Sequence, residues 1–341
     1  MNRKSLPFVL FLFVSLSINL PLYSENLEVK IDAVENPDNF HFVVMGDRTG
    51  GEQKGVFEQM ISKVNLMCPA FVVNVGDNIA GYTTDPNNVN NQWDEFDSLV
   101  KKLNVPYLKV SGNHDITNEM MADIYQKRFG KTYYYSIYKN VLFLFLNSDD
   151  PSASIDQKLK KELEEEKKKL KEMAKTQGVT PAGLMMLKEY EEKNREMHGG
   201  TIADAQFEFA SKVLADHNNV RWTFVIMHKP LWKLSSPPAN WTKIENILKD
   251  RPYTVFAGHE HINSYSQNNS RDYIVTATCG GSQGPASIPG IYHHIYWITM
   301  DSTGPTIANL LADGILEKTD IRPKNGSDTI DVKKIVEEFS K

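Results

Sequence analysis

Hydrophobic residues recur along the chain in short runs that are rich in β-branched and aromatic side chains and are bounded by polar turns. Runs of this length and composition are typical of buried strands. The predicted strands are 42–45, 71–75, 107–110, 133–138, 141–146, 222–227, 253–257, 273–278, 292–299 and 306–311. Short turns join 133–138 to 141–146 and 292–299 to 306–311, so we expect two antiparallel hairpins. The sheets are therefore predicted to be mixed.

Helical patterns separate several of these strands. In 55–65 the residues Val56, Met60 and Val64 recur four positions apart, and 93–103 carries a similar apolar stripe. A helix needs such a stripe to cover one face of a sheet. Strands mixed with amphipathic helices indicate a layered α/β or α+β fold.

Residues 151–200 break this rhythm with a dense run of lysine and glutamate. The run predicts a charged helix, and Thr180 followed by Pro181 predicts the N-terminus of a second helix. We therefore expect an inserted helical hairpin. One interpretation is a solvated hairpin without a specific role, and the other is a lid or a surface for a protein partner.

The two ends of the chain differ in character from the part between them. Residues 1–24 combine basic residues, an apolar stretch and a plausible cleavage site after Ser24, which predicts a signal peptide. The alternative is an uncleaved membrane anchor. With cleavage, no transmembrane segment is expected, and the protein would be exported to the periplasm or secreted. Residues 25–315 are predicted to form the domain, and 316–341 a peripheral tail with a short helix at 329–339.

Composition narrows the class of protein. The 341 residues are 41% hydrophobic and 24% charged, with a formal net charge of −5. These values exclude disordered and collagen-like chains and leave no electrostatic footprint for nucleic acid. The two cysteines, Cys68 and Cys279, are too few for a disulfide framework, so we expect buried free thiols, with a disulfide between them as the alternative.

Polar clusters follow the carboxyl ends of five predicted strands. The clusters are 46–51, 76–78, 112–115, 228–230 and 258–261. In sheets with parallel strands, ligands bind where strands end and loops begin. The clusters supply carboxylates, an amide and histidines, a donor set that suits Mn, Fe or Zn better than Ca. We therefore expect a metal site at this edge.

The order of these clusters resembles that of the calcineurin-like metallophosphoesterase superfamily. The chain reads Gly-Asp, Gly-Asp-Asn, Gly-Asn-His-Asp, a lone histidine after a strand, and Gly-His-x-His, over about residues 40–281. The resemblance implies a four-layer α/β/β/α sandwich of two mixed sheets flanked by helices. It also implies a hydrolase that acts on phosphoric ester bonds and binds two divalent metal ions.

The resemblance further implies a role for each motif residue. Asp77 would bridge both ions. The remaining ligands would be Asn113, His228 and His259 for one ion, and Asp47 and His261 for its neighbour. A hydroxide held by the ions would attack the phosphorus of a monoester or diester.

Two motifs carry residues beyond the ligands. His114 matches the histidine that faces the substrate and helps to protonate or stabilise the leaving oxygen, while Asp115 would orient His114 or cap the turn. Thr49 stands where the family usually has a histidine ligand, so one ion could be bound more weakly. Arg48 is a candidate phosphate clamp, with a structural arginine paired to an acid as the alternative.

Further residues near these motifs are candidates for the substrate pocket. The aromatic candidates are Tyr82, Trp93, Trp232 and Trp241. Of these, Trp232 is preferred and Trp93 is expected in the core. The turn 280–282 could direct backbone amides at the site or could be a tight turn only. The pair 293–294 is expected to be structural, because neighbouring strand residues face opposite sides.

Two other functions stay open at this level. Thr49 suggests a catalytically weak relative that binds phosphate or metal, and 151–200 suggests an interaction scaffold. The substrate class is also open and includes phosphorylated small molecules, nucleotides and phospholipid head groups.

Overall fold

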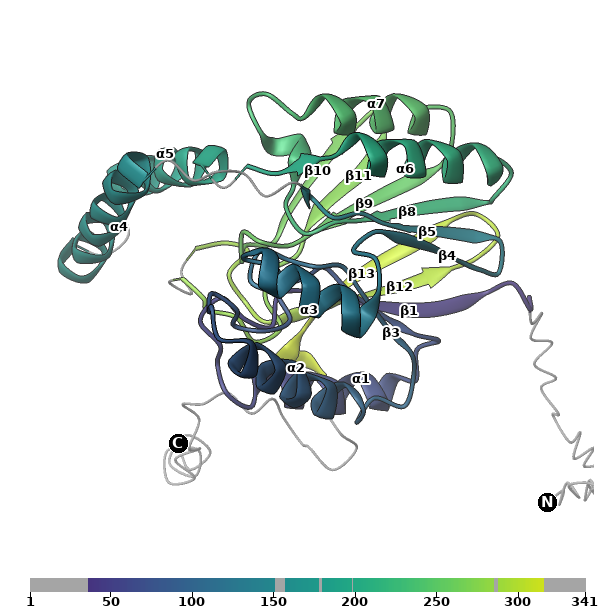
Figure 1. Cartoon of the computed structure of the whole chain (residues 1–341), viewed down its shortest axis with the longest axis horizontal. Coiled ribbons are helices and arrows are strands. Elements are labelled where there is room, and N and C mark those ends of the chain that lie inside the picture. Colours follow the sequence, from purple (N-terminus) through teal and green to yellow (C-terminus); the bar gives the residue numbers. More distant parts are fainter. Residues whose placement is uncertain (1–35, 151–156, 178–179, 198, 285–287, 316–341) are drawn as a thin grey trace, which may run out of the picture. The chain divides into compact units, whose positions relative to one another are not determined.

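A computed structural model describes residues 36–315, apart from 151–156, 178–179, 198 and 285–287 (Figure 1). The predicted signal peptide and the tail 316–341, with its expected helix, lie outside the described residues. Within the described ranges, none of the helices combines the length and the apolar character that a bilayer crossing needs.

The first sheet has the strand order β13-β12-β1-β2-β3. Its strands are β1 (Phe40–Met45), β2 (Val72–Asn74), β3 (Tyr107–Lys109), β12 (His294–Met300) and β13 (Pro305–Leu311). The strands β1, β2 and β3 run parallel, whereas β12 pairs antiparallel with β1, and β13 pairs antiparallel with β12. The carboxyl ends of the three parallel strands therefore lie at one edge, where polar motifs follow them.

The second sheet has the order β10-β11-β9-β8-β5-β4. Its strands are β4 (Tyr134–Tyr138), β5 (Val141–Phe145), β8 (Trp222–Ile226), β9 (Tyr253–Ala257), β10 (Ser264–Asn268) and β11 (Arg271–Val275). The pairings β4–β5 and β12–β13 confirm both predicted hairpins. Strand β10 was not predicted, because its sequence Ser-Tyr-Ser-Gln-Asn is polar and mostly exposed at the sheet edge.

Helices cover the outer face of each sheet (Figure 1). Helices α1 (Val56–Met67), α2 (Pro86–Val100) and α3 (Glu119–Phe129) pack on the first sheet, and α6 (Asp204–Asp216) and α7 (Ala239–Leu248) pack on the second. Single 3₁₀ turns lie at Leu231–Lys233 and Ala312–Gly314. The predicted four-layer α/β/β/α sandwich of mixed sheets is confirmed.

A third apolar cluster fills the space between the two sheets. Strand β1 turns Phe42 and Val44 into it, while Val43 and Met45 face the helices. The ring of Phe42 meets Phe143 of β5 edge-on, with centroids 5.2 Å apart. Because interiors pack like crystals rather than liquids, this cluster fixes how the strand ends of one sheet meet those of the other.

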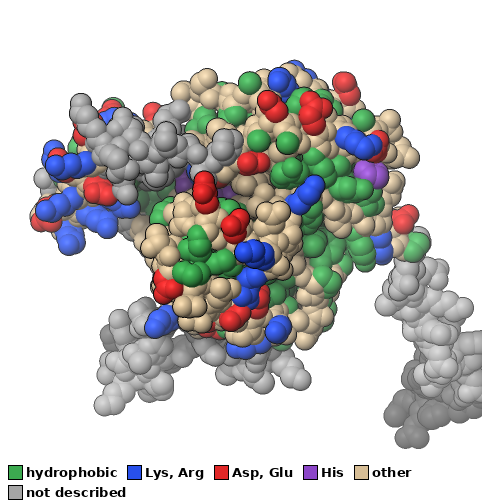
Figure 2. Space-filling model, in the orientation of Figure 1, with side chains coloured by type: hydrophobic (Ala, Val, Ile, Leu, Met, Phe, Trp, Pro, Cys, Tyr) green, Lys and Arg blue, Asp and Glu red, His purple; other side chains and the backbone are tan. Residues whose placement is uncertain are grey.

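Residues 157–197 hold the two helices expected in the insertion, α4 (Gln157–Gln177) and α5 (Pro181–Met197). The backbone N–H of Gly183 donates to Thr180 Oγ1 at 3.0 Å, so Thr180 caps α5 as predicted. Leu163 and Tyr190 form a small buried cluster between the helices. Figure 2 shows side chains of both charges over this hairpin, and its role stays a prediction.

The hairpin leaves the domain through a short parallel pair, β6 (Asp149–Asp150) and β7 (Thr201–Ile202). This base is bonded to the loop after β8: Ser148 Oγ accepts from the backbone N–H of Lys229 at 2.7 Å, and Lys229 Nζ lies 3.0 Å from Asp149 Oδ1. The insertion is therefore anchored beside a predicted ligand loop.

Candidate metal centre

Two groups of side chains could each hold a metal ion. Asp77, His228 and His259 form one group, and Asp47, Asp77 and His261 form the other. Within each group the possible ligand atoms lie within 4.8 Å of one another. Asp77 belongs to both groups, which is the arrangement that a bridging carboxylate requires.

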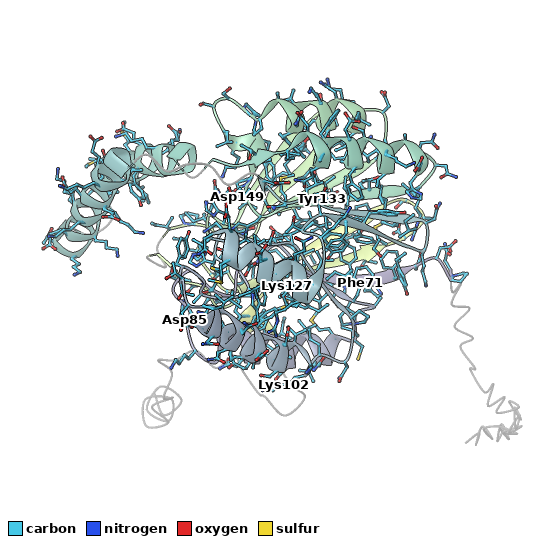
Figure 3. The ribbon with its side chains drawn as sticks, viewed as in Figure 1. Phe71, Asp85, Lys102, Lys127, Tyr133 and Asp149 are labelled. Carbon is cyan, nitrogen blue, oxygen red and sulfur yellow. The ribbon has the colours of Figure 1, made fainter. Side chains whose placement is uncertain are left out.

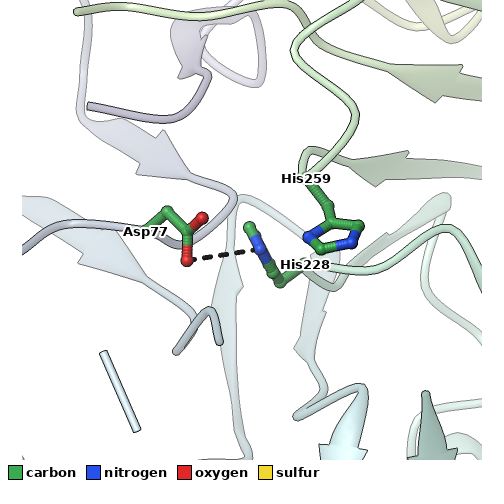
Figure 4. Close-up of side chains that lie close together, drawn as sticks. All are labelled: Asp77, His228 and His259. Atoms are coloured by element: carbon green, nitrogen blue, oxygen red, sulfur yellow. Dashed lines mark ion pairs between the residues drawn. The ribbon is translucent and has the colours of Figure 1, made fainter. Parts of the chain in front are cut away.

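The two sheets contribute different ligand types. Asp47 and Asp77 follow β1 and β2 of the first sheet, whereas His228, His259 and His261 follow β8 and β9 of the second. Figure 4 shows Asp77 facing His228, with His259 beside them, and His228 Nε2 lies 3.3 Å from Asp77 Oδ1. The centre thus exists only where the ends of the two sheets meet.

Backbone carbonyls orient two of the imidazoles. His228 Nδ1 lies 2.9 Å from the carbonyl oxygen of Val75, and His261 Nδ1 lies 2.8 Å from that of Ser282. With Nδ1 donating, each ring presents Nε2 to a carboxylate, and His261 Nε2 lies 3.3 Å from Asp47 Oδ2. This arrangement leaves Nε2 as the ligand atom in both rings. The sequence analysis singled out the turn 280–282 for its backbone amides, but not for the Ser282 carbonyl, and it did not point to the Val75 carbonyl.

Two glycines of the motifs are required by close approach. A Cβ at Gly112 would lie 2.1 Å from Asp77 Oδ1, and a Cβ at Gly258 would lie 2.2 Å from Asp47 Oδ1. No side chain fits at such distances. Each glycine therefore lets a carboxylate from one loop contact the backbone of a neighbouring loop.

Backbone conformation at the centre is uncommon. Asp77, His259 and His261 have φ angles of 55°, 72° and 56°, in the left-handed region that favours glycine. Such residues persist only where surrounding contacts hold them, and they gather at functional sites. Here the backbone N–H of His259 donates to Asp47 Oδ2 at 2.9 Å, so a carboxylate of one sheet holds a strained turn of the other.

The carboxylates are buried and their electrostatics favour cations. Burial acts to raise the pKa of Asp77, but the facing imidazoles of His228 and His114 outweigh it and hold that pKa below its usual value. Burial acts to lower the pKa of His228, whereas the Asp77 carboxylate raises it, to about 9. A charged carboxylate at this depth needs a positive partner.

One buried oxygen gives a direct test of whether a metal fits. Asp47 is fully buried, and its Oδ1 has no hydrogen-bond partner among the described residues. An orphaned carboxylate oxygen inside a protein is costly. A divalent cation between Asp47, Asp77 and His261 would satisfy it, and the oxygen and imidazole donors suit Mn, Fe or Zn. The residues present therefore fit a metal.

Asn113 and His114 lie at the same edge, after β3. Asn113 Oδ1 lies 3.0 Å from His228 Nε2, so the structure brings it to the group of His228 and His259. His114 Nδ1 lies 2.7 Å from the Ala80 carbonyl oxygen, and its Nε2 lies 4.0 Å from Asp77 Oδ2. His114 is partly exposed and faces the centre without joining either ligand group.

Asp115 caps the turn rather than orienting His114. Its carboxylate is fully buried and accepts from the backbone N–H groups of Gly112, Asn78 and Ile79 at 2.9, 2.8 and 3.1 Å. Burial, together with nearby Asp77, raises the pKa of Asp115 to about 6. The residue thus ties the second and third motifs together.

Arg48 has the contacts of a structural residue. It is 3% exposed, and its Nη2 lies 3.0 Å from Glu52 Oε1 and 2.7 Å from Glu95 Oε2. Its Nη1 donates to the Asn78 carbonyl oxygen at 3.0 Å. A phosphate clamp would require the guanidinium to leave both carboxylates, so these contacts fit the alternative of a paired structural arginine.

The other candidates divide between core and centre. Trp93 and Trp241 are fully buried in the helix-covered cores, and Trp232 packs with Tyr273 against the core under α6 and α7. Tyr82 is the candidate that lies at the centre: its hydroxyl accepts from Asn113 Nδ2 at 2.9 Å, and its ring meets His114 edge-on at 4.7 Å. Trp232, the preferred candidate for the substrate pocket, lies against the core instead, because its distance in sequence from His228 does not determine where its side chain points.

The remaining motifs have structural partners. Within the turn 280–282, the N–H of Gly281 donates to the Asp47 carbonyl oxygen at 3.2 Å, so this amide is used inside the protein. His294 is buried between Ala277 N–H and Asn309 Oδ1, as expected for a structural histidine. Cys279 is a buried free thiol, whereas Cys68 is free but exposed, contrary to expectation, because it follows α1 at the surface.

Comparison with known proteins now decides the family. Residues 40–263 match the calcineurin-like phosphoesterase family. The chain belongs to that family. The resemblance found in the motifs is thus confirmed, and membership makes this calcineurin-like phosphoesterase a metal-dependent hydrolase of phosphoric esters.

Solved structures agree with the fold. A dimetal phosphatase from Danio rerio is 12% identical with a TM-score of 0.50, over 80% of this chain and 99% of that chain. The purple acid phosphatase PPD1 from yellow lupin (Lupinus luteus) seeds is 14% identical with a TM-score of 0.51, over 82% of this phosphoesterase and 52% of that chain. Among curated proteins, no relative matches.

Proposed function

We propose that this phosphoesterase is exported and hydrolyses a phosphomonoester or phosphodiester at a binuclear centre built from both sheets. The observation that carries the proposal is Asp77, a buried carboxylate shared by two ligand groups. Two divalent cations, when bound, lower the pKa of a water and polarise a phosphoryl oxygen. Mn, Fe and Zn suit these donors.

The chain's own residues would hold the metal ions and protonate the leaving oxygen. Asp47, Asp77 and Asn113 bring oxygen ligands from the first sheet, and the second sheet brings imidazoles already oriented by backbone carbonyls. His114 acts on the leaving oxygen. Because its Nδ1 donates to the Ala80 carbonyl, its Nε2 is the atom that holds or gives the proton.

Tyr82 forms the wall beside the leaving group. Its side chain is 55% exposed, yet its hydroxyl is bonded to Asn113 and its ring contacts His114. The bond from Asn113 Nδ2 fixes which end of that amide faces the metal group. The exposed part of the ring gives the organic part of a substrate an aromatic surface to contact, which favours substrates with a planar or apolar leaving group.

A metal-reconstituted assay tests this function. Protein stripped with a chelator and reloaded with Mn²⁺, Fe²⁺ or Zn²⁺ should hydrolyse p-nitrophenyl phosphate or bis(p-nitrophenyl) phosphate, and the chelated protein should not. Tyr82→Phe should weaken metal binding at the Asn113 group, whereas Tyr82→Ala should also raise KM for aryl more than for alkyl phosphates. Absence of turnover with every metal would favour the alternative, a protein that binds phosphate or metal only.

Export is tested separately. The full chain, expressed in a Gram-negative host, should appear in the periplasmic fraction with an N-terminal mass that corresponds to cleavage after Ser24. Retention of the full-length mass in the membrane fraction would support the anchor alternative. The result is independent of the hydrolase assay.

A further inference from the structure

A cavity of about 360 Å³ lies away from the metal centre, and none of the residues that line it is a candidate metal ligand. It is bounded by β3 at the edge of the first sheet, by α3, and by β4 at the edge of the second sheet. Figure 3 labels Tyr133 on its wall, and in Figure 2 hydrophobic side chains gather beside α3 in this region. Its volume lies in the range of small-molecule sites.

Aromatic rings form most of the wall. Tyr133 and Tyr135 pack against Phe209 of α6, with ring centroids 5.1 and 6.3 Å away. The Tyr134 hydroxyl donates to the Lys109 carbonyl oxygen at 2.9 Å and accepts from the N–H of Lys109 at 3.1 Å. These contacts join the edges of the two sheets, so the flat faces are held in place before any ligand binds.

Two ammonium groups face this aromatic space. Lys109 Nζ lies 3.7 Å from the ring centroid of Phe129, and Lys131 Nζ lies 5.8 Å from that of Tyr133. In the described part of the chain, no carboxylate lies within ion-pair distance of either nitrogen. Burial lowers the pKa of Lys109, although the more distant carboxylates of Asp115 and Asp97 act to raise it.

We propose that this cavity binds a small planar aromatic anion, a carboxylate, sulfonate or phosphate joined to one or two fused rings. The rings of Tyr133 and Tyr135 offer stacking surfaces, and Lys109 and Lys131 offer donors to the anionic group. A neutral aromatic compound would leave the two ammonium groups without a direct ion pair. A phosphate without a ring would leave the aromatic walls uncovered.

Calorimetric titration with naphthalene-2-sulfonate tests the site on the full-length protein. A sulfonate has no phosphoester bond to cleave, so binding is measured without turnover. Lys109→Met keeps the aliphatic stem and removes the charge, and it should weaken binding by about tenfold or more. Lys127→Met is the matched control, because Lys127 is exposed on α3, which bounds the cavity, but does not line the cavity itself (Figure 3). It should leave affinity unchanged.

Two further measurements keep the outcome decisive. Tyr135→Ala removes a 43% exposed ring from the wall, so the variant should fold and should bind about threefold more weakly. Affinity should be the same with and without Mn²⁺, because the metal centre is not involved. The proposal is overturned if the probe fails to bind at millimolar concentration, if it binds only with Mn²⁺, or if Lys109→Met and Tyr135→Ala both bind as tightly as the Lys127→Met control.

Discussion

The two halves of the metal centre are built differently. The first sheet supplies the charge: Asp47 and Asp77 are 0% and 1% exposed and are held by backbone N–H groups of neighbouring loops. The second sheet supplies imidazoles: His228 is 1% exposed, as buried as the carboxylates, whereas the side chain of His261 is 17% exposed. Negative charge thus comes from the first sheet, and the imidazoles that face it come from the second.

This difference shows what the sandwich has to achieve. Neither half is sufficient, because each ligand group combines a carboxylate of one sheet with a histidine of the other. The aromatic cluster between the sheets, with Phe42 against Phe143 and Phe224, holds the two strand edges in register. The charge of the first half is tolerated inside the protein because the imidazoles of the second half lie opposite, and divalent cations, when bound, would balance it further.

The most severe way to break the centre is to change the shared residue. Asp77→Asn removes a charge from both ligand groups, so bound metal should fall for both sites and turnover should fall by at least about a thousandfold. His259→Ala affects one group only and should leave about one ion per chain. Both variants are tested by metal content, from mass spectrometry, and by turnover. Asp123→Asn, on the exposed surface of α3, is the control. Wild-type metal content in Asp77→Asn would contradict the shared role.

His114 tests whether the first half also does acid–base chemistry. It belongs to neither ligand group, so His114→Ala should keep both ions and lose turnover by about a hundredfold or more. The loss should be smaller for aryl phosphates, whose leaving groups need less protonation. Parallel measurement of metal content and of rates across leaving groups decides the matter. Equal losses for all leaving groups would indicate charge stabilisation instead of proton transfer.

Two histidines sharpen the comparison between the halves. Burial dominates at His294 of the first sheet and lowers its pKa to about 4, whereas Asp77 raises the pKa of His228 to about 9. A lowered histidine pKa stabilises the fold fully above the unfolded value of about 6.5, and this stabilisation is lost as the pH falls from 6.5 to 4. The loss amounts to about 3 kcal/mol.

In His294→Gln, the free energy of unfolding should therefore depend less on pH between pH 6.5 and pH 4. Denaturant unfolding of wild type and variant, both without metal, should give a difference in unfolding free energy that shrinks between pH 6.5 and pH 4. A difference that stays constant over this range would mean that His294 does not titrate on unfolding. Asn309 Oδ1 and Ala277 N–H provide partners for the glutamine amide.

The smallest expected effect concerns Thr49, which stands where the family usually has a histidine ligand. Thr49→His adds an imidazole beside Asp47, and the weaker of two metal affinities should tighten several-fold. Thr49 is 2% exposed, so the larger ring should also cost about 1–3 kcal/mol of stability. Calorimetry with Mn²⁺ measures the affinity. An unchanged weaker affinity in the folded variant would mean that residue 49 does not point at the metals.

Sequence patterns identified the parts of the site that depend on residue type and order. Strand ends followed by Asp47, Asp77 or His228 could be recognised because a hydrophobic run stops at a polar residue. Helices α3, α6 and α7 were not predicted, although α7 carries an apolar stripe at Trp241, Ile244 and Leu248. The sequence also could not predict which way a side chain points. Only the fold shows that Arg48 contacts Glu95 and that Tyr82 contacts His114.

Loops that hold ligands by main-chain contacts carry no sequence signal either. The Val75 and Ser282 carbonyls orient imidazoles, and any residue type offers a carbonyl. The left-handed conformations of Asp77, His259 and His261 follow from long-range contacts, because no local preference of these residues requires them.

The short β6–β7 pair has a consequence for how this chain could have acquired its hairpin. Asp149 pairs with Thr201 and Asp150 with Ile202, so the two ends of the inserted segment lie next to each other. Closing a loop costs chain entropy, but that cost rises only slowly with loop length. Insertions of very different length can therefore be exchanged at this point while the sandwich, and the ligand loops at its edge, keep their geometry.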